Sequence, residues 1–174
     1  DRYLARLSDS GQKNAQFYAR ADNLNNWLGD AGTRLGSLSQ RLSASVGQVR
    51  LSEKLQVGND AEESGLVGRD GVYETPWLQI DNVFYEARGQ AWALAHLLRA
   101  IEVDFADVLA KKNATVSVRQ IIRELEAAQA TLWSPMILNG SGYGILANHS
   151  LVMANYISRA NAGLIDLRQL LSQG

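Results

Sequence analysis

The sequence predicts an all-α fold: an antiparallel bundle of about four long helices with glycine-rich connecting loops, forming one domain over residues 1–174. Apolar side chains recur at steps of four and three in four separate segments, the spacing of one buried helix face. The connecting segments contain clusters of glycine, and no segment shows the alternating, β-branched pattern of a strand. A length of 174 residues is the usual size of a single domain.

The clearest helix is expected over residues 80–112. Pro76 and Asp81 mark its start, because proline and acidic side chains are favoured at a helix N-terminus. Lys111, Lys112 and Asn113 mark its exit, where cations and a capping residue are favoured. A single helix of about 30 residues would be about 45 Å long, which suits a bundle. Its apolar stripe consists of Ile80, Phe84, Ala87, Ala91, Leu94, Leu98, Ile101, Phe105 and Val108.

Three further helices are predicted, one before the central helix and two after it. The stripe of the first consists of Leu24, Leu28, Ala31, Leu35, Leu38 and Leu42. Gly29, Gly32 and Gly36 interrupt this helix, each at a cost of about 1 kcal/mol relative to alanine, which close approach of another helix would offset. The third helix is expected to start with Ser117 as its cap and to continue through Leu132. The last should run from about Ser150 to the end of the chain.

Two breaks separate these helices. Val57 to Thr75 contains four glycines and is predicted to be a long exposed loop or a short hairpin. The second break, Trp133 to Asn148, contains the run Asn139-Gly140-Ser141-Gly142-Tyr143-Gly144. Gly140, Ser141, Gly142 and Gly144 precede a helix, so their backbone N–H groups could bind an anion. A flexible connector is the simpler interpretation of the same glycines.

Composition excludes several classes of function. Seventeen basic and eighteen acidic side chains give a net charge of −1, which argues against a nucleic-acid-binding module and against charge-driven membrane binding. The absence of cysteine excludes disulfides, zinc ribbons, iron–sulfur sites and thiol catalysis. With only two histidines, His96 and His149, neither a metal nor a cofactor is predicted. The motifs of zinc proteases, phosphate-binding loops, serine hydrolases and di-iron bundles are absent.

A second stripe on the central helix is the main candidate binding site. It follows the same four-and-three spacing and combines aromatic rings with a glycine, an imidazole and a guanidinium: Tyr85, Gly89, Trp92, His96 and Arg99. Glu86 and Arg88 flank it, and Glu86 could pair with a basic group of a neighbouring helix. The simplest interpretation is a central helix covered on both sides, with Tyr85 and Trp92 in the core. The alternatives are a surface for a partner or ligand, and catalysis.

The segment over residues 76–94 carries the pattern Asn-x-Phe-Tyr-Glu-Ala-Arg-Gly-x-x-Trp-Ala-Leu, from Asn82 to Leu94. It resembles an uncharacterised, membrane-anchored family of proteobacterial proteins, domain of unknown function family 2333. The resemblance implies no activity, cofactor or catalytic residue. It implies that the chain, which begins at Asp1, is the soluble fragment of a longer protein anchored in the inner membrane and facing the periplasm.

These observations favour a cell-envelope scaffold or protein-interaction domain without catalytic activity. A protein partner or self-association is expected, with no nucleic acid, and with membrane contact only through an anchor outside the fragment. The alternative is a bundle that binds a small molecule or lipid along the stripe of Tyr85, Trp92, His96 and Arg99. An enzyme acting through Glu86, Arg88 and His96 is a third hypothesis.

Overall fold

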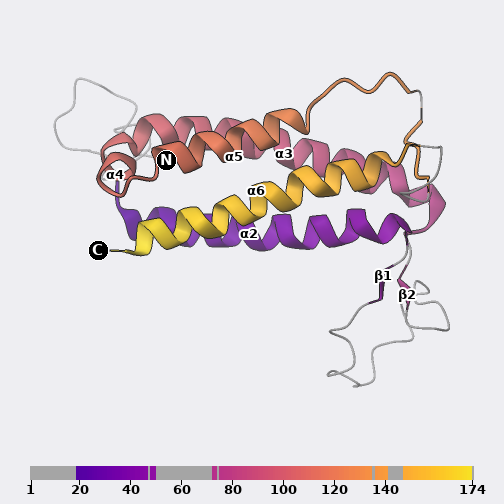
Figure 1. Ribbon diagram of the computed structural model, residues 1–174, viewed down its shortest axis with the longest axis horizontal. Coiled ribbons are helices and arrows are strands. Elements are labelled where there is room, and N and C mark those ends of the chain that lie inside the picture. The colour runs from indigo at the N-terminus through magenta and orange to yellow at the C-terminus, as the bar shows by residue number, and fades with distance from the viewer. Residues whose placement is uncertain are drawn as a thin grey trace, which may run out of the picture.

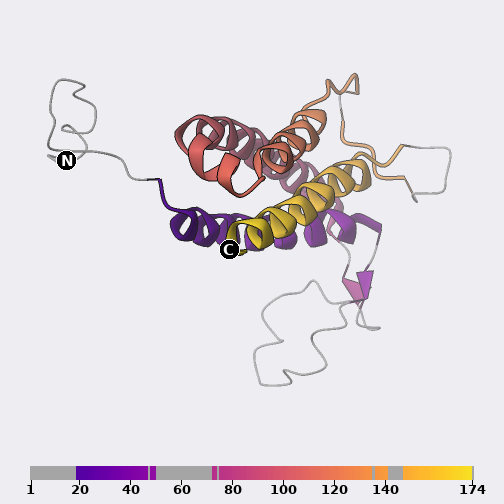
Figure 2. The ribbon, with the colours of Figure 1, turned by 60° about the vertical axis from the view of Figure 1, so that its left-hand side comes forward.

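Four long helices form an up-and-down antiparallel bundle in the computed structural model, which describes residues 19–46, 48–49, 72–73, 75–134, 136–140 and 147–173 (Figure 1). The long helices are α2 (Ala21–Ser43), α3 (Ile80–Asp104), α5 (Thr115–Ala127) and α6 (His149–Ser172). Helices α3 and α5 form one layer over α2 and α6 (Figures 1 and 2). The predicted all-α antiparallel bundle is therefore confirmed.

The glycines of α2 allow α6 to approach closely, as expected. A β-carbon at Gly29 would lie 3.1 Å from Cζ of Arg168, and one at Gly32 would lie 3.3 Å from Oδ1 of Asn161. The leucines on another side of α2 are buried in the core: Leu24, Leu28, Leu35, Leu38 and Leu42. Packing against α6 thus offsets the low helix propensity of these glycines.

The prediction of one continuous helix over residues 80–112 is wrong. Helix α3 ends at Asp104, Phe105 leaves the helical conformation with φ −109° and ψ 20°, and the short helix α4 (Ala106–Lys111) follows. The bend buries Leu109 completely, while Val108, the expected next member of the stripe, stays half-buried. The predicted exit is confirmed, because Asn113 adopts the left-handed conformation with φ 53°, which asparagine tolerates better than most residues.

The predicted start and end of the third helix are also wrong. Helix α5 begins at Thr115, with Ala114 at the N-cap, so Ser117 lies inside it. The tight turn at Asn113 explains this, since the N–H of Val118 already donates to the carbonyl of Ala114. The helix ends at Ala127 instead of Leu132.

Helix α6 begins at His149, one residue before the prediction, and the side chain of Asn148 accepts a hydrogen bond of 2.8 Å from the N–H of Leu151.

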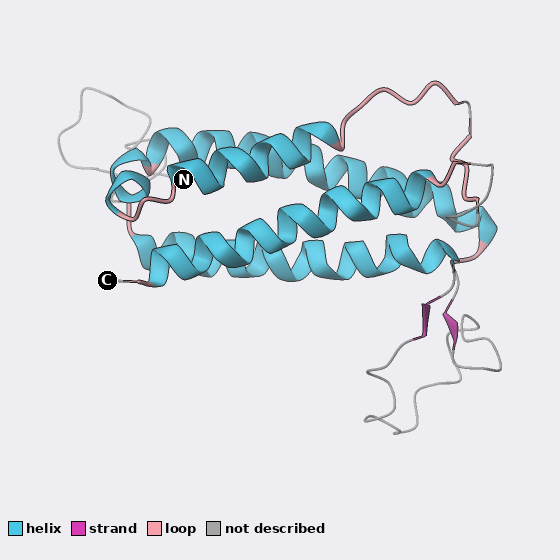
Figure 3. Cartoon of the chain, in the orientation of Figure 1, coloured by secondary structure: helices cyan, strands magenta, loops and turns pink. Residues whose placement is uncertain are grey.

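The connection from α2 to α3 leaves the bundle at one end. After the 3₁₀ turn η1 (Ala44–Val46), strand β1 (Gln48–Val49) pairs antiparallel with β2 (Val72–Tyr73), and the 3₁₀ turn η3 (Trp77–Gln79) leads into α3 (Figure 3). The four glycines of the predicted loop or hairpin lie outside the described residues. Among the packed pairs of the four long helices, α2 and α3 contact each other least, so this side of the bundle is the most open.

Candidate functional site

The outer face of α3 points away from the core and carries large apolar side chains. Tyr85 is 57% exposed, Trp92 56% and Val103 75%. We define the outer face by its exposed aromatic, small and apolar side chains: Tyr85, Gly89, Trp92, Ala93, His96, Ala100 and Val103. The interpretation of Tyr85 and Trp92 as core residues is therefore wrong.

Trp92 and His96 form a stacked aromatic pair at the middle of this face. Their ring centroids lie 4.2 Å apart with planes inclined by 38°. The imidazole Nδ1 lies 2.8 Å from the carbonyl oxygen of Trp92, which holds the ring over the same helical turn. This contact restricts the rotamers of both exposed rings, so a contact made by them would lose little side-chain entropy.

Small residues lie beside the aromatic side chains on this face. A β-carbon at Gly89 would meet no atom of the described residues within 4 Å. Ala93 and Ala100 lie on the same side of the helix at 100° per residue, and both are exposed. The predicted close approach at Gly89 is thus not made by any element that the structure describes.

Glu86 pairs with a neighbouring helix, as expected. Both of its carboxylate oxygens accept hydrogen bonds from Arg41 of α2, at 2.6 and 2.9 Å, and Gln90 donates a third of 3.0 Å. The hydrogen bonds from Arg41 hold the pKa of Glu86 below its ordinary value, although partial desolvation opposes this shift. Glu86 therefore joins α2 to α3.

Arg88 has a structural role at the end of α5. Its guanidinium donates to the carbonyl oxygens of Gln129 at 2.8 Å and Ala130 at 3.0 Å, and the Gln129 amide donates back to the carbonyl of Arg88. These bonds satisfy carbonyl groups just beyond the C-terminus of α5 and fix that end against α3.

Two ion pairs continue the contact between α3 and α5. Arg99 pairs with Glu126, and Glu102 pairs with Arg119. All four side chains lie at or near the surface, so these pairs contribute little to stability. They do place charges along the α5 side of α3 and leave its outer face mostly apolar.

The structure does not bring the three residues of the enzyme hypothesis together. Glu86 and His96 are separated by ten residues of one helix, about 15 Å of axial rise. Glu86 and Arg88 engage α2 and the end of α5, in different directions. Within the part of the chain that the structure describes, no three histidine, aspartate or glutamate side chains form a group that could hold a metal ion.

Only Gly140 of the predicted anion-binding loop can be placed. Its N–H donates to the carbonyl of Ala147 at 3.1 Å, and its carbonyl accepts from the Asn148 amide at 2.6 Å. Ser141, Gly142 and Gly144 lie outside the described residues. Gly140 therefore uses its N–H within the chain, and it is bonded to the two residues that precede α6.

Sequence reasoning missed two features. Val103 extends the second stripe, and its position four residues after Arg99 was the available signal. The other is a groove between α2 and α3, lined by residues that include Trp27, Arg34, Gln90 and Leu97. No spacing within one helix could indicate the groove, because its walls come from two helices.

Comparison with known proteins places the chain in a family. No curated protein and no solved structure matches it. Among the helices of the described residues, none has the length and apolarity needed to cross a membrane. The model of the family "Uncharacterized protein conserved in bacteria (DUF2333)" matches residues 1–174. Because this match covers the whole chain, the protein belongs to the bacterial DUF2333 family.

Proposed function

We propose that this chain is a non-catalytic helical interaction domain that pairs with a second copy of itself through the outer face of α3. One observation carries this proposal: aromatic and small side chains follow heptad spacing on a helix face that is exposed along its length. Heptad spacing allows the side chains of two helices to interdigitate. Contiguous exposed apolar surface of this kind marks interaction sites in soluble domains.

Size and charge favour an antiparallel pair. With a two-fold axis near residue 94, Tyr85 of one copy would face Val103 of the other, Gly89 would face Arg99, and Trp92 would face His96. The aliphatic part of each Arg99, whose guanidinium pairs with Glu126 of its own chain, would then lie over the open space at Gly89 of the other copy.

A parallel pair would place two Arg99 side chains together and two Gly89 positions together. The contact between the two Arg99 side chains would bring like charges together. The contact between the two Gly89 positions would leave a gap without packing partners. Ala93 would lie beside the axis of the antiparallel pair, where its small side chain allows close approach of the two helices.

Sedimentation equilibrium of the purified chain tests the proposal. The wild-type chain is expected to dimerise, and Trp92→Ala should weaken dimerisation by about tenfold or more, as loss of a central aromatic anchor does at interfaces. Ile165→Ala is the matched control, because Ile165 is 57% exposed but lies on α6. This control should dimerise like the wild type, and circular dichroism should show all three chains folded. A wild-type chain that stays monomeric at its highest soluble concentration contradicts the proposal.

We also propose that the domain acts in the bacterial cell envelope, as the periplasmic part of an inner-membrane-anchored protein. Membership of a bacterial family supports the bacterial setting, while the anchor and the periplasmic side rest on the resemblance alone. Fractionation of cells producing the full-length protein should recover it with inner membranes, and protease added to spheroplasts should digest the domain. Recovery in the cytosol, or protection from protease, would contradict this location.

A further inference from the structure

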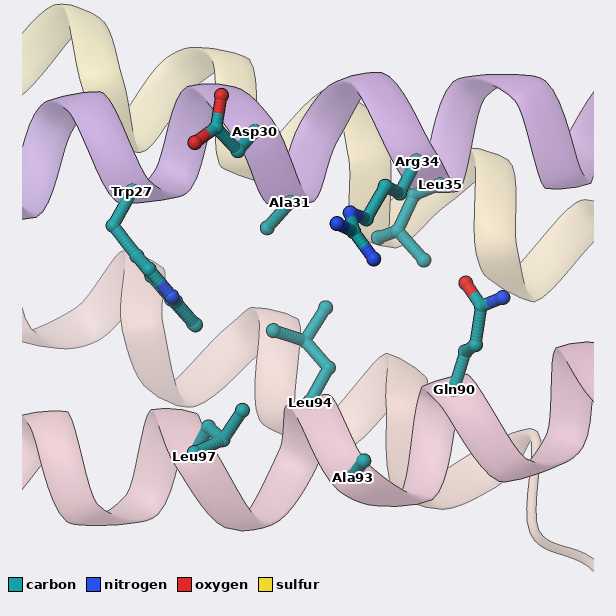
Figure 4. A pocket seen from close by; sticks show the side chains of 9 residues that line it. All are labelled: Trp27, Asp30, Ala31, Arg34, Leu35, Gln90, Ala93, Leu94 and Leu97. Carbon is teal, nitrogen blue, oxygen red and sulfur yellow. The ribbon is translucent and has the colours of Figure 1, made fainter.

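The open side of the bundle contains a groove between α2 and α3. It has a volume of about 440 Å³, which lies within the range of small-molecule sites. Leu35 of α2 and Leu94 of α3 line it and are almost fully buried. Ala31 and Ala93 lie opposite each other between the two ends, where their small side chains keep the groove open (Figure 4).

The two ends of the groove differ in polarity. Because α2 and α3 are antiparallel, Trp27 lies at the same level as Leu97, and Arg34 lies toward Gln90 (Figure 4). The first pair makes one end largely apolar. Figure 4 shows the amide of Gln90 at the other end and the guanidinium of Arg34 nearer the middle of the groove, on the side of Leu94. The two levels are seven residues apart on each helix, about 10 Å along the axis.

Arg34 is available to bind an anion. Its guanidinium extends from α2 toward α3, whereas the carboxylate of Asp30, one turn earlier, points away from the groove (Figure 4). No residue in the described part of the chain hydrogen-bonds or forms an ion pair with Arg34. A guanidinium beside apolar walls pairs well with a carboxylate, which it can bind through two parallel hydrogen bonds.

We propose that this groove binds a single-chain amphiphile with a carboxylate head, that is, a fatty acid. The carboxylate pairs with Arg34 and accepts a hydrogen bond from Gln90, and the alkyl chain lies along Leu94 toward Trp27 and Leu97. Gln90 also donates to Glu86, so one N–H of its amide remains for the head group. Of the residues that line the groove, Ala93 also belongs to the outer face of α3, and the others lie outside the dimer contact proposed above.

Titration calorimetry with dodecanoate below its micelle-forming concentration tests the proposal. Wild-type chain should bind the acid, while dodecanoate methyl ester, which has the same chain and no charge, should bind at least about tenfold more weakly. Arg34→Gln should weaken binding of the acid by a similar factor. Arg123→Gln is the matched control, because Arg123 is an exposed arginine of α5. It should leave affinity unchanged.

Equal affinity for the acid and the ester, or undiminished binding by Arg34→Gln, would overturn the proposal. A second titration uses vesicles of phosphatidylcholine and phosphatidylglycerol. Binding to these vesicles that depends on Arg34, without binding of dodecanoate, would assign the groove to a bilayer lipid and overturn the fatty-acid assignment. Arg34→Gln should still dimerise in sedimentation experiments, so failure of this proposal is distinguishable from failure of the dimer proposal.

Discussion

Replacing Gly89 and Gly163 by alanine should have opposite effects on stability. Each glycine lies inside a helix, where alanine is more stable by about 0.5–1 kcal/mol. At Gly89 a β-carbon meets no described atom within 4 Å, so the unfolding free energy of the monomer should rise by about that amount. At Gly163 a β-carbon would lie 2.7 Å from Cγ1 of Ile121, a side chain that is 1% exposed.

The clash at Gly163 determines that Gly163→Ala lowers the stability of the chain instead of raising it. Forcing a methyl group into a packed contact costs about 1–3 kcal/mol, which exceeds the gain in helix propensity at all but the lowest value. Gly163→Ala should therefore destabilise the chain by up to about 2.5 kcal/mol. Urea unfolding followed by circular dichroism, at concentrations where the chain is monomeric, measures both variants. A gain in stability at Gly163 equal to that at Gly89 would refute the described packing of α5 against α6.

Gly89→Ala should also change the stability of the monomer and the affinity of the dimer in opposite directions. The added methyl group would occupy space that the antiparallel pair gives to Arg99 of the second copy. We therefore expect a more stable monomer and a dimer weakened several-fold by sedimentation equilibrium. If Gly89→Ala leaves dimerisation unchanged, Gly89 does not lie in the contact.

The remaining predictions concern the links that hold the bundle together. Glu86→Gln should cost less than about 1 kcal/mol at pH 7, because the ion pair with Arg41 is partly exposed. The pKa of Glu86 is lowered in the folded chain, so the unfolded chain takes up the proton first and this stabilisation is lost as the pH falls below about 4. Urea unfolding should show a larger difference from wild type at pH 7 than at pH 3; an equal loss at both would contradict a charge effect. Asn148→Ala should cost about 1 kcal/mol or more, because it removes both the cap of α6 and the amide that donates to the carbonyl of Gly140. Asn148→Ser loses the same amide but keeps a capping oxygen, so it should cost less. Equal losses for these two variants in urea unfolding would show that the bond to Leu151 is unimportant.

The helices could be predicted from periodicity, but the break after α3 and the ends of α5 could not. Phe105 fits the apolar stripe of a continuous helix, and the pattern is the same whether or not the backbone bends there. At the bend the chain turns into the short helix α4, and packing of α4 buries Leu109 in the core. Likewise, Ser117 is a good capping residue by type, but the turn at Asn113 starts α5 earlier than a serine cap allows.

The residues of the candidate site could be predicted from the sequence, but whether they are buried or exposed could not. Spacing placed Tyr85 and Trp92 on a second face of the central helix, but spacing alone does not say whether another helix covers that face. The contacts of Glu86 and Arg88 depend on where α2 and the end of α5 lie, as does the groove at Arg34. These are consequences of how the helices pack, which no single segment encodes.

Cross-linking of single-cysteine variants tests the antiparallel pair most directly, because the sequence contains no cysteine. Ala93→Cys should place two thiols near the two-fold axis, within reach of a short thiol-reactive cross-linker. Ala100 is also exposed to solvent, so Ala100→Cys is the matched control. In the antiparallel pair the thiols that Ala100→Cys introduces into the two copies would be separated by twelve residues along the helices, about 18 Å. Efficient dimer formation by Ala93→Cys and little by Ala100→Cys is the predicted result. Equal cross-linking of both variants would indicate a parallel pair, and none for Ala93→Cys would contradict pairing through the outer face of α3.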